Sequence, residues 1–99
     1  MYRGTTPTIT FALPFDSGQI TALNLCFSQA GKIILEKDLS ACVAEGKTLR
    51  VALAEAETLL FDANAMVEMQ LRIGCEEIRM ASNIMRISVE RILKDGCLE

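Results

Sequence analysis

Hydrophobic and polar residues alternate along most of this chain, and a period of two residues is typical of a β-strand with one buried and one solvated face. The clearest stretch is MVEMQLRIG, residues 66–74, in which apolar residues alternate with charged or amide residues. The same rhythm occurs in residues 8–13, 20–28, 32–39 and 48–53. The side chains predicted to face the core are Ile9, Phe11, Leu13, Leu23, Leu25, Phe27, Ile33, Leu35, Leu49, Val51, Leu53, Val67, Met69, Leu71 and Ile73.

Turn-forming residues separate these stretches. Pro14 cannot donate to a β-ladder, and Asp16-Ser17-Gly18 favours a turn. Gly31, in the loop SQAG, lies where a hairpin needs a positive φ, and a polar turn is expected around residues 45–47. In residues 54–61 the alternation breaks, because Ala and Glu favour helix and three apolar residues are adjacent. We therefore predict one helical turn that crosses one end of the fold.

Residues 84–96, IMRISVERILKDG, fit both a strand and a helix. Counted by twos, Met85, Ile87 and Val89 share a face, whereas a helical period joins Met85, Val89 and Ile92 in one stripe. A helix would place the weak helix formers Ile87, Ser88 and Val89 in its interior. We therefore predict a strand over residues 84–91.

A hairpin is predicted between the strand at residues 66–74 and a strand that begins at Ile78. The loop would be Gly74-Cys75-Glu76-Glu77, with Ile78 and Met80 facing the core. The residues predicted to face the core are even-numbered in this strand but odd-numbered from Met85 onward. One extra residue near Ser82-Asn83, as a β-bulge or a kink, would produce this change.

About seven short antiparallel strands with one helical turn describe an all-β, immunoglobulin-like β-sandwich. A chain of 99 residues can bury a core of its own and fits one domain. We assign that domain to residues 1–97. Leu98-Glu99 has the form of a cloning scar and is left out of the domain.

The residue types present favour a non-enzymatic protein. The chain has no histidine, so Ser-His and Cys-His nucleophiles cannot be built. Its four cysteines, in no C-x-x-C pair, are interpreted as free thiols, and we expect no metal, no cofactor and no catalytic residue. Glu55 and Glu57 could form a carboxylate pair, but we interpret them as solvated residues of the connector. The cysteines are Cys26, Cys42, Cys75 and Cys97.

Charge and hydropathy limit the classes of partner that we expect for this chain. The net charge is −3 and the basic residues are scattered, whereas nucleic-acid binders gather them on one face. No stretch has the 18 or so apolar residues of a membrane span, and the start of the chain lacks a signal sequence. We therefore expect no nucleic acid or membrane as partner, and a cytoplasmic location at synthesis.

The first strand is the candidate interaction surface. Its threonines, Thr6, Thr8 and Thr10, form an unbroken polar face, and the edge of a sandwich can pair with another subunit. An ordinary solvated edge strand explains the same pattern.

Four motifs resemble those of small proteins encoded in prophages of Gram-positive gut bacteria. These are R-G-T-T-P-T at Arg3–Thr8, F-x-L-P-F-D at Phe11–Asp16, T-L-x-F-D at Thr58–Asp62 and V-E-R-I-L-K-D-G at Val89–Gly96. The third departs from the pattern by having two leucines before Phe61. The resemblance covers nearly the whole chain.

This resemblance implies a phage virion or its assembly, for example as a tail or baseplate accessory. The expected partners are other phage structural proteins or the chain itself, first in the host cytoplasm and then in the virion. The alternative is an immunoglobulin-like adhesion module that binds a host surface or a carbohydrate. Carbohydrate sites generally stack aromatic rings on the sugar, and this chain has no Trp and a single Tyr.

Overall fold

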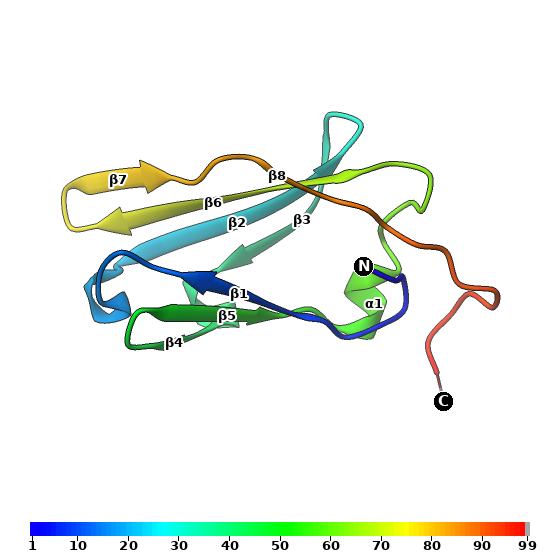
Figure 1. Ribbon diagram of the computed structural model, residues 1–99, viewed down its shortest axis with the longest axis horizontal. Helices are drawn as coiled ribbons and strands as arrows, with labels where there is room; N and C mark the ends of the chain where they lie inside the picture. Colours follow the sequence, from blue (N-terminus) through cyan, green and yellow to red (C-terminus); the bar gives the residue numbers. More distant parts are fainter. Residues whose placement is uncertain (99) are drawn as a thin grey trace.

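The computed structural model describes residues 1–98, and nearly half of them lie in β-strands (Figure 1). The predicted scar residue Glu99 is outside the described residues. A helical turn, α1 (Glu55–Thr58), lies where the break in alternation predicts it. Two 3₁₀ turns, η1 (Ser17–Gln19) and η2 (Leu39–Ala41), occur earlier in the chain. The strands are β1 (Thr8–Ala12), β2 (Ala22–Gln29), β3 (Lys32–Asp38), β4 (Cys42–Glu45), β5 (Thr48–Ala52), β6 (Val67–Cys75), β7 (Ile78–Ala81) and β8 (Met85–Ile87).

The strands form two antiparallel sheets that pack face to face (Figure 1). One sheet has the order β1-β5-β4, and the other has the order β3-β2-β6-β7, with β8 also paired to β6. In an immunoglobulin sandwich the corresponding orders are B-E-D and C′-C-F-G. The predicted all-β, immunoglobulin-like sandwich is therefore confirmed.

The core lies between the sheets and consists mainly of the alternating residues that the sequence predicts. Phe27 and Phe61 pack within it, with ring centroids 5.8 Å apart. Ile9, Phe11 and Leu35 are half-buried instead of fully buried, because they lie on edge strands. The residues predicted to face inward that are buried are Leu13, Leu23, Leu25, Phe27, Leu49, Val51, Leu53, Val67, Met69, Leu71 and Ile73.

The predicted inward position of Ile33 is wrong. The β2–β3 register shifts between Phe27 and Ser28, so that Leu35 lies opposite Phe27 while Ile33 lies opposite Ser28. Ile34 is therefore an extra residue, and such a bulge turns the residues beyond it to the other face. Ile33 is 57% exposed on the outer face of the sheet.

The predicted extra residue between β7 and β8 is confirmed. Ala81 lies opposite Arg72 and Met85 lies opposite Met69, so four steps along the outer strand correspond to three along β6. The strand predicted over residues 84–91 is too long, because β8 ends at Ile87. After β8 the chain leaves β6 and pairs in parallel with the first residues, through a bridge between Tyr2 and Glu90.

The core positions predicted for Ile78 and Met80 are wrong. Met80 lies opposite the buried Ile73, so it does have the inward orientation. However, the β6–β7 hairpin extends beyond the end of the three-stranded sheet (Figure 1). Ile78 and Met80, on β7 of this hairpin, are 62% and 37% exposed.

Two turns and one strand show how far the residue pattern specifies local structure. The hairpin turn at Ala30-Gly31 has positive φ at both residues, as predicted for Gly31. Cys75 remains in β6, so the β6–β7 turn is only Glu76-Glu77. Strand β4 was not predicted, and only its last residue, Glu45, lies in the polar turn expected around residues 45–47. It has just one half-buried residue, Cys42, so no alternation marks it in the sequence.

Candidate functional site

Two edge strands meet on one side of the sandwich. β1 is an edge of the three-stranded sheet, and the interrupted strand β7–β8 is an edge of the five-stranded sheet. Residues of β1 and β7 line a common groove, which places both edges on the same side. We call this region, between β1 and β7–β8, the open side.

The backbone of β1 presents unpaired groups along this side. The N–H of Leu13 donates to the carbonyl of Lys47 (2.8 Å), and the N–H of Leu53 donates to that of Pro7 (2.9 Å). In an antiparallel ladder alternate residues bond to the same neighbour, so the odd-numbered residues of this segment bond to β5. The N–H and C=O groups of Thr8, Thr10 and Ala12 therefore point to the edge, where residues 1–98 place no further strand.

The vacant position beside β1 has a counterpart in complete sandwiches. An immunoglobulin sheet has the order A-B-E-D, in which strand A covers the edge of strand B. Here β1 takes the place of strand B, and the described residues supply no strand in the place of A. Of the threonines singled out in the sequence, Thr8 and Thr10 lie in β1 with exposed side chains. Thr6 is exposed but precedes Pro7, outside the strand.

The residues along this edge carry no charge. Natural proteins usually protect edge strands with charged residues, bulges or prolines. Residues 4–15 contain no charged side chain, and Pro7 and Pro14 bracket β1. Because proline has no N–H to donate, the two prolines limit an added ladder to residues 8–13.

An apolar groove of about 300 Å³ lies next to the edge. Phe15 was not singled out in the sequence, and Met80 was assigned to the core. Both line the groove because the packing of the two sheets brings the edge strands β1 and β7 together, and no local sequence pattern reports that packing. The apolar side chains of the lining are Phe11, Ala12, Leu13, Pro14, Phe15, Leu71, Ile73, Met80 and Ala81.

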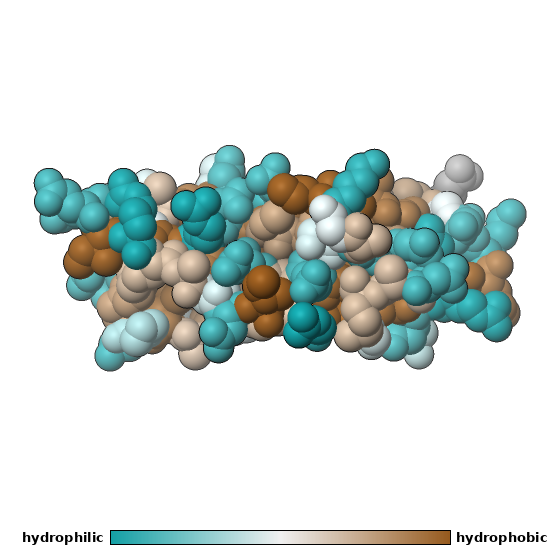
Figure 2. Space-filling model, turned by 90° about the horizontal axis from the view of Figure 1, so that it is seen from above, coloured by the Kyte–Doolittle hydropathy of each residue, from teal (hydrophilic) through white to brown (hydrophobic). Residues whose placement is uncertain are grey.

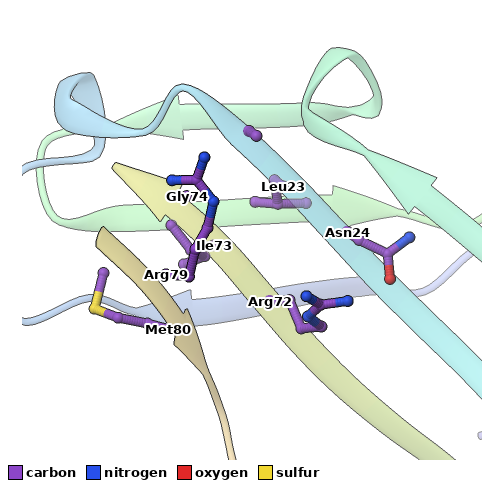
Figure 3. Close-up of a pocket in the computed structure, with 8 residues that line it drawn as sticks. Leu23, Asn24, Arg72, Ile73, Gly74, Arg79 and Met80 are labelled. Atoms are coloured by element: carbon purple, nitrogen blue, oxygen red, sulfur yellow. The ribbon is translucent and has the colours of Figure 1, made fainter. Parts of the chain in front are cut away.

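The upper surface of the molecule, on the side of the five-stranded sheet, is more polar than the lining of the groove. Figure 2 shows its hydrophobic residues as separate patches between hydrophilic ones. A hollow of about 230 Å³ there is bordered by Asn24, Arg72 and Arg79 (Figure 3). The Arg79 guanidinium donates to the carbonyls of Glu76 (2.6 Å) and Ile78 (3.0 Å), and the Asn24 amide donates to Glu36 (3.1 Å). Two of its three polar side chains are thus already engaged within the protein.

The acidic residues of α1 have structural roles. Glu57 is not a solvated connector residue, as the sequence suggested: it forms an ion pair with Lys37 and accepts the N–H of Ala54 (2.7 Å). Burial raises the pKa of Glu57, but the bonds from Lys37 and Ala54 outweigh it, so this pKa lies below its ordinary value. A general acid at neutral pH needs a raised pKa, so Glu57 is unsuited to that role. Glu55 accepts the N–H of Leu98 (3.0 Å).

The thiols and acids offer little for metal or covalent chemistry. All four cysteines are free, and burial raises the pKa of Cys26 and Cys42, which keeps these thiols protonated and weakly nucleophilic. Among the described residues, no three Cys, Asp or Glu side chains gather as metal ligands. Nor does the described chain contain a helix with the length and hydrophobicity needed to cross a bilayer.

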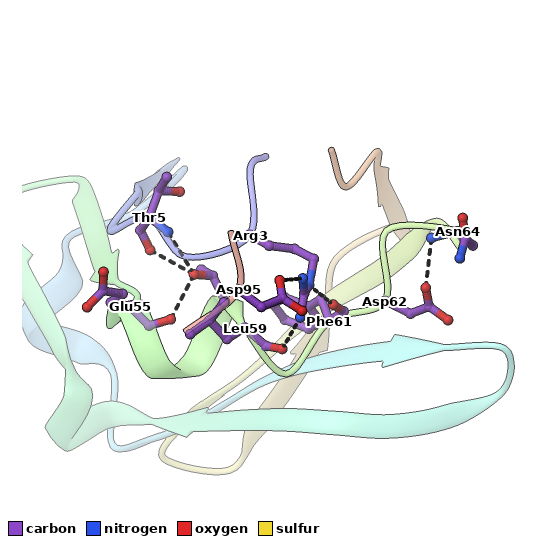
Figure 4. Close-up of polar contacts among 9 residues, drawn as sticks. Arg3, Thr5, Glu55, Leu59, Phe61, Asp62, Asn64 and Asp95 are labelled. Atoms are coloured by element: carbon purple, nitrogen blue, oxygen red, sulfur yellow. Dashed lines mark hydrogen bonds and ion pairs between the residues drawn. The ribbon is translucent and has the colours of Figure 1, made fainter. Parts of the chain in front are cut away.

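Buried polar contacts hold the segment that leads into β1. The hydroxyl of Thr58 is fully buried, donates to the carbonyl of Thr5 (2.8 Å) and accepts its N–H (3.1 Å). Arg3 donates to the carbonyls of Phe61 (2.7 Å) and Leu59 (3.0 Å) and pairs with Asp95 (Figure 4). The crossing from β5 to β6 therefore positions the residues that precede β1.

Gln29 holds the far end of that crossing. Its buried side-chain amide donates to the carbonyls of Asp62 (2.7 Å) and Ala65 (2.9 Å), and its side-chain oxygen accepts the N–H of Asp62 (2.7 Å). Three backbone groups of the loop before β6 are thus bonded without water.

No family model, no curated protein and no solved structure matches this chain.

Proposed function

We propose that this protein is a non-enzymatic assembly subunit that acts through protein–protein contacts at its open side. The unpaired edge of β1 beside an apolar groove is the observation that carries the proposal. A strand added to β1 would form backbone hydrogen bonds with Thr8, Thr10 and Ala12. Alternate side chains of that strand would face the inner side of the sheet and reach the groove.

We further propose that the setting is a phage particle or its assembly, with the protein as a tail or baseplate accessory or another virion part. The support is the resemblance of four motifs to prophage-encoded proteins. Two of these motifs, Arg3–Thr8 and Phe11–Asp16, contain most of β1 and its flanking residues. Arg3 of the first motif bonds to Leu59 and Phe61 in the motif Thr58–Asp62 and to Asp95 in the motif Val89–Gly96. The motifs thus supply the open edge and the framework that holds it.

The adhesion alternative receives less support. Carbohydrate sites stack aromatic rings on the ligand. All the aromatic residues lie within the described part of the chain, and only Tyr2 is exposed. Phe27 and Phe61 are buried in the core, and the half-buried Phe11 and Phe15 line the groove of the open side.

The proposal is tested in purified particles from an induced lysogen that encodes the chain. Mass spectrometry should detect the wild-type chain in gradient-purified particles. The variant Thr10→Lys should be lost from them, while Val43→Lys, on the opposite edge strand β4, should be retained. Absence of the wild-type chain from particles, together with an unchanged particle yield when its gene is deleted, would overturn the proposal.

A further inference from the structure

We infer that the vacant position beside β1 is filled by β1 of a second copy of this chain, paired antiparallel about a two-fold axis at Thr10. This inference rests on the proposed function, because both use the same edge. It adds the identity of the partner and the register of the contact.

The register follows from the groups that point outward. Antiparallel pairing about Thr10 places Thr8 opposite Ala12 of the other copy and Thr10 opposite its own counterpart. Each of these residue pairs exchanges two backbone hydrogen bonds, so every outward N–H and C=O of β1 is satisfied. A shift of the register by two residues in one direction places Thr8 opposite Pro14, which has no N–H to donate. The opposite shift places Ala12 opposite Thr6, which lies outside β1, beyond Pro7.

The absence of charge singles out β1 among the edge strands. A residue at a two-fold axis faces its own copy, so a charged residue there would oppose a like charge. The other edge strands of the described chain all contain charged residues, whereas β1 contains none. These residues are Lys32, Glu36, Lys37 and Asp38 in β3, Glu45 in β4, Arg79 in β7 and Arg86 in β8.

The side chains of β1 also complement themselves. On the outer face Thr10 would lie beside Thr10 of the other copy, and threonine pairs stabilise antiparallel strands. On the inner face Ile9 would lie beside Phe11 of the other copy, an aromatic and β-branched pair. Ile9 and Phe11 are only half-buried in the single chain, so pairing would complete their burial.

The groove extends this contact beyond the backbone ladder. A two-fold axis perpendicular to the sheet keeps both inner faces on the same side, so the open sides of the two copies face each other. Phe15 and Met80, at the rim of each groove, would then lose solvent contact. Because β1 has only five residues, the interface is small, and interfaces below about 1,200 Å² are typical of weak, reversible complexes.

The test is analytical ultracentrifugation of the full chain over a range of concentrations. The wild-type chain should show a monomer–dimer equilibrium, and Thr10→Lys should raise its dissociation constant at least tenfold. Val43→Lys is the matched control, because Thr10 and Val43 flank Arg50 in the same row of the sheet, on opposite edges. Both substitutions put a lysine beside Arg50, so both introduce the same like-charge contact within one chain. Circular dichroism and thermal melting show whether each variant is folded.

A charge-reversal mixture tests the register. Thr10→Lys and Thr10→Glu should each be monomeric alone, and a mixture of the two should form a heterodimer because lysine then faces glutamate across the axis. A wild-type chain that is monomeric at every concentration, or equal dimerisation of Thr10→Lys and Val43→Lys, would overturn the inference.

The two proposals fail separately. A monomeric wild-type chain that still needs Thr10 to enter particles would refute pairing between copies and leave the proposed function, with a strand of another protein on β1. A Thr10-dependent dimer that is absent from particles, with an unchanged particle yield when the gene is deleted, would support pairing between copies and refute the proposed setting.

Discussion

Replacing Thr58 with valine should destabilise the protein strongly, although valine has nearly the same shape. The Thr58 hydroxyl is fully buried and bonds to both backbone groups of Thr5. Thr58→Val removes these two hydrogen bonds and leaves the N–H and C=O of Thr5 without their partner. Each bond contributes about 1 kcal/mol net, and an unsatisfied buried group costs about 1–3 kcal/mol.

We expect Thr58→Val to lower the free energy of unfolding by about 2–3 kcal/mol, because Thr5 is exposed at the surface and water can satisfy part of the loss. For a domain of this size that corresponds to a decrease in Tm of roughly 10–20 °C. Urea denaturation followed by circular dichroism measures the change, with an unchanged slope showing that unfolding remains two-state.

Two further variants separate the hydroxyl from the methyl group. Thr58→Ser keeps the hydroxyl and loses one methyl group, at a cost of about 1 kcal/mol. Thr6→Val makes the same chemical change at an exposed position, where effects are usually within about 0.5 kcal/mol. If Thr58→Val proves as stable as Thr58→Ser or more so, the hydrogen bonds to Thr5 do not hold the N-terminal segment, and the reasoning is wrong.

Three other predictions concern local features. Ala30→Asn should raise the urea midpoint and increase the free energy of unfolding by about 0.5–1 kcal/mol. Ala30 has a φ of 51° in a tight hairpin turn, a conformation that Asn tolerates better than Ala. An unchanged midpoint would show that the backbone of Ala30 is not strained. The pKa of Glu57 is lowered, because its bonds from Lys37 and Ala54 outweigh the effect of burial. The contribution of Glu57 to stability is therefore present above pH 4.5, the ordinary pKa of the group, and is lost as the pH falls through the lower pKa of the folded state. Glu57→Gln should therefore reduce stability at pH 7 and weaken its dependence on pH below 4.5 in parallel urea titrations, and identical pH profiles would contradict this role. Ile78→Ser should change the unfolding free energy by no more than about 0.5 kcal/mol, whereas Ile73→Ser should lower it by about 3 kcal/mol or more, since only Ile73 is buried. Similar losses of stability for the two variants in thermal melts would mean that Ile78 is also buried in the core.

The alternation of residue types determined which face of most strands is buried. In β6 the period of two assigns Val67, Met69, Leu71 and Ile73 to the core, because successive side chains of a strand point to opposite sides. The change of inward parity before Met85 likewise revealed one extra residue between β7 and β8. These features are local, so the sequence contains them. The threonines that mark β1 as a polar-faced strand are local in the same sense.

Tertiary structure decided what lies opposite each face and beside each edge. Ile78 and Met80 have the inward orientation that their spacing predicts, but the hairpin that carries them extends past the opposing sheet. Ile33 is turned outward by a bulge that no residue pattern predicts. The groove depends on β1 and β7 being neighbours across the sandwich, although they are more than 60 residues apart in the sequence. Periodicity reports the direction of a side chain, whereas burial and pairing depend on contacts between distant segments, and these exist only once both sheets have formed.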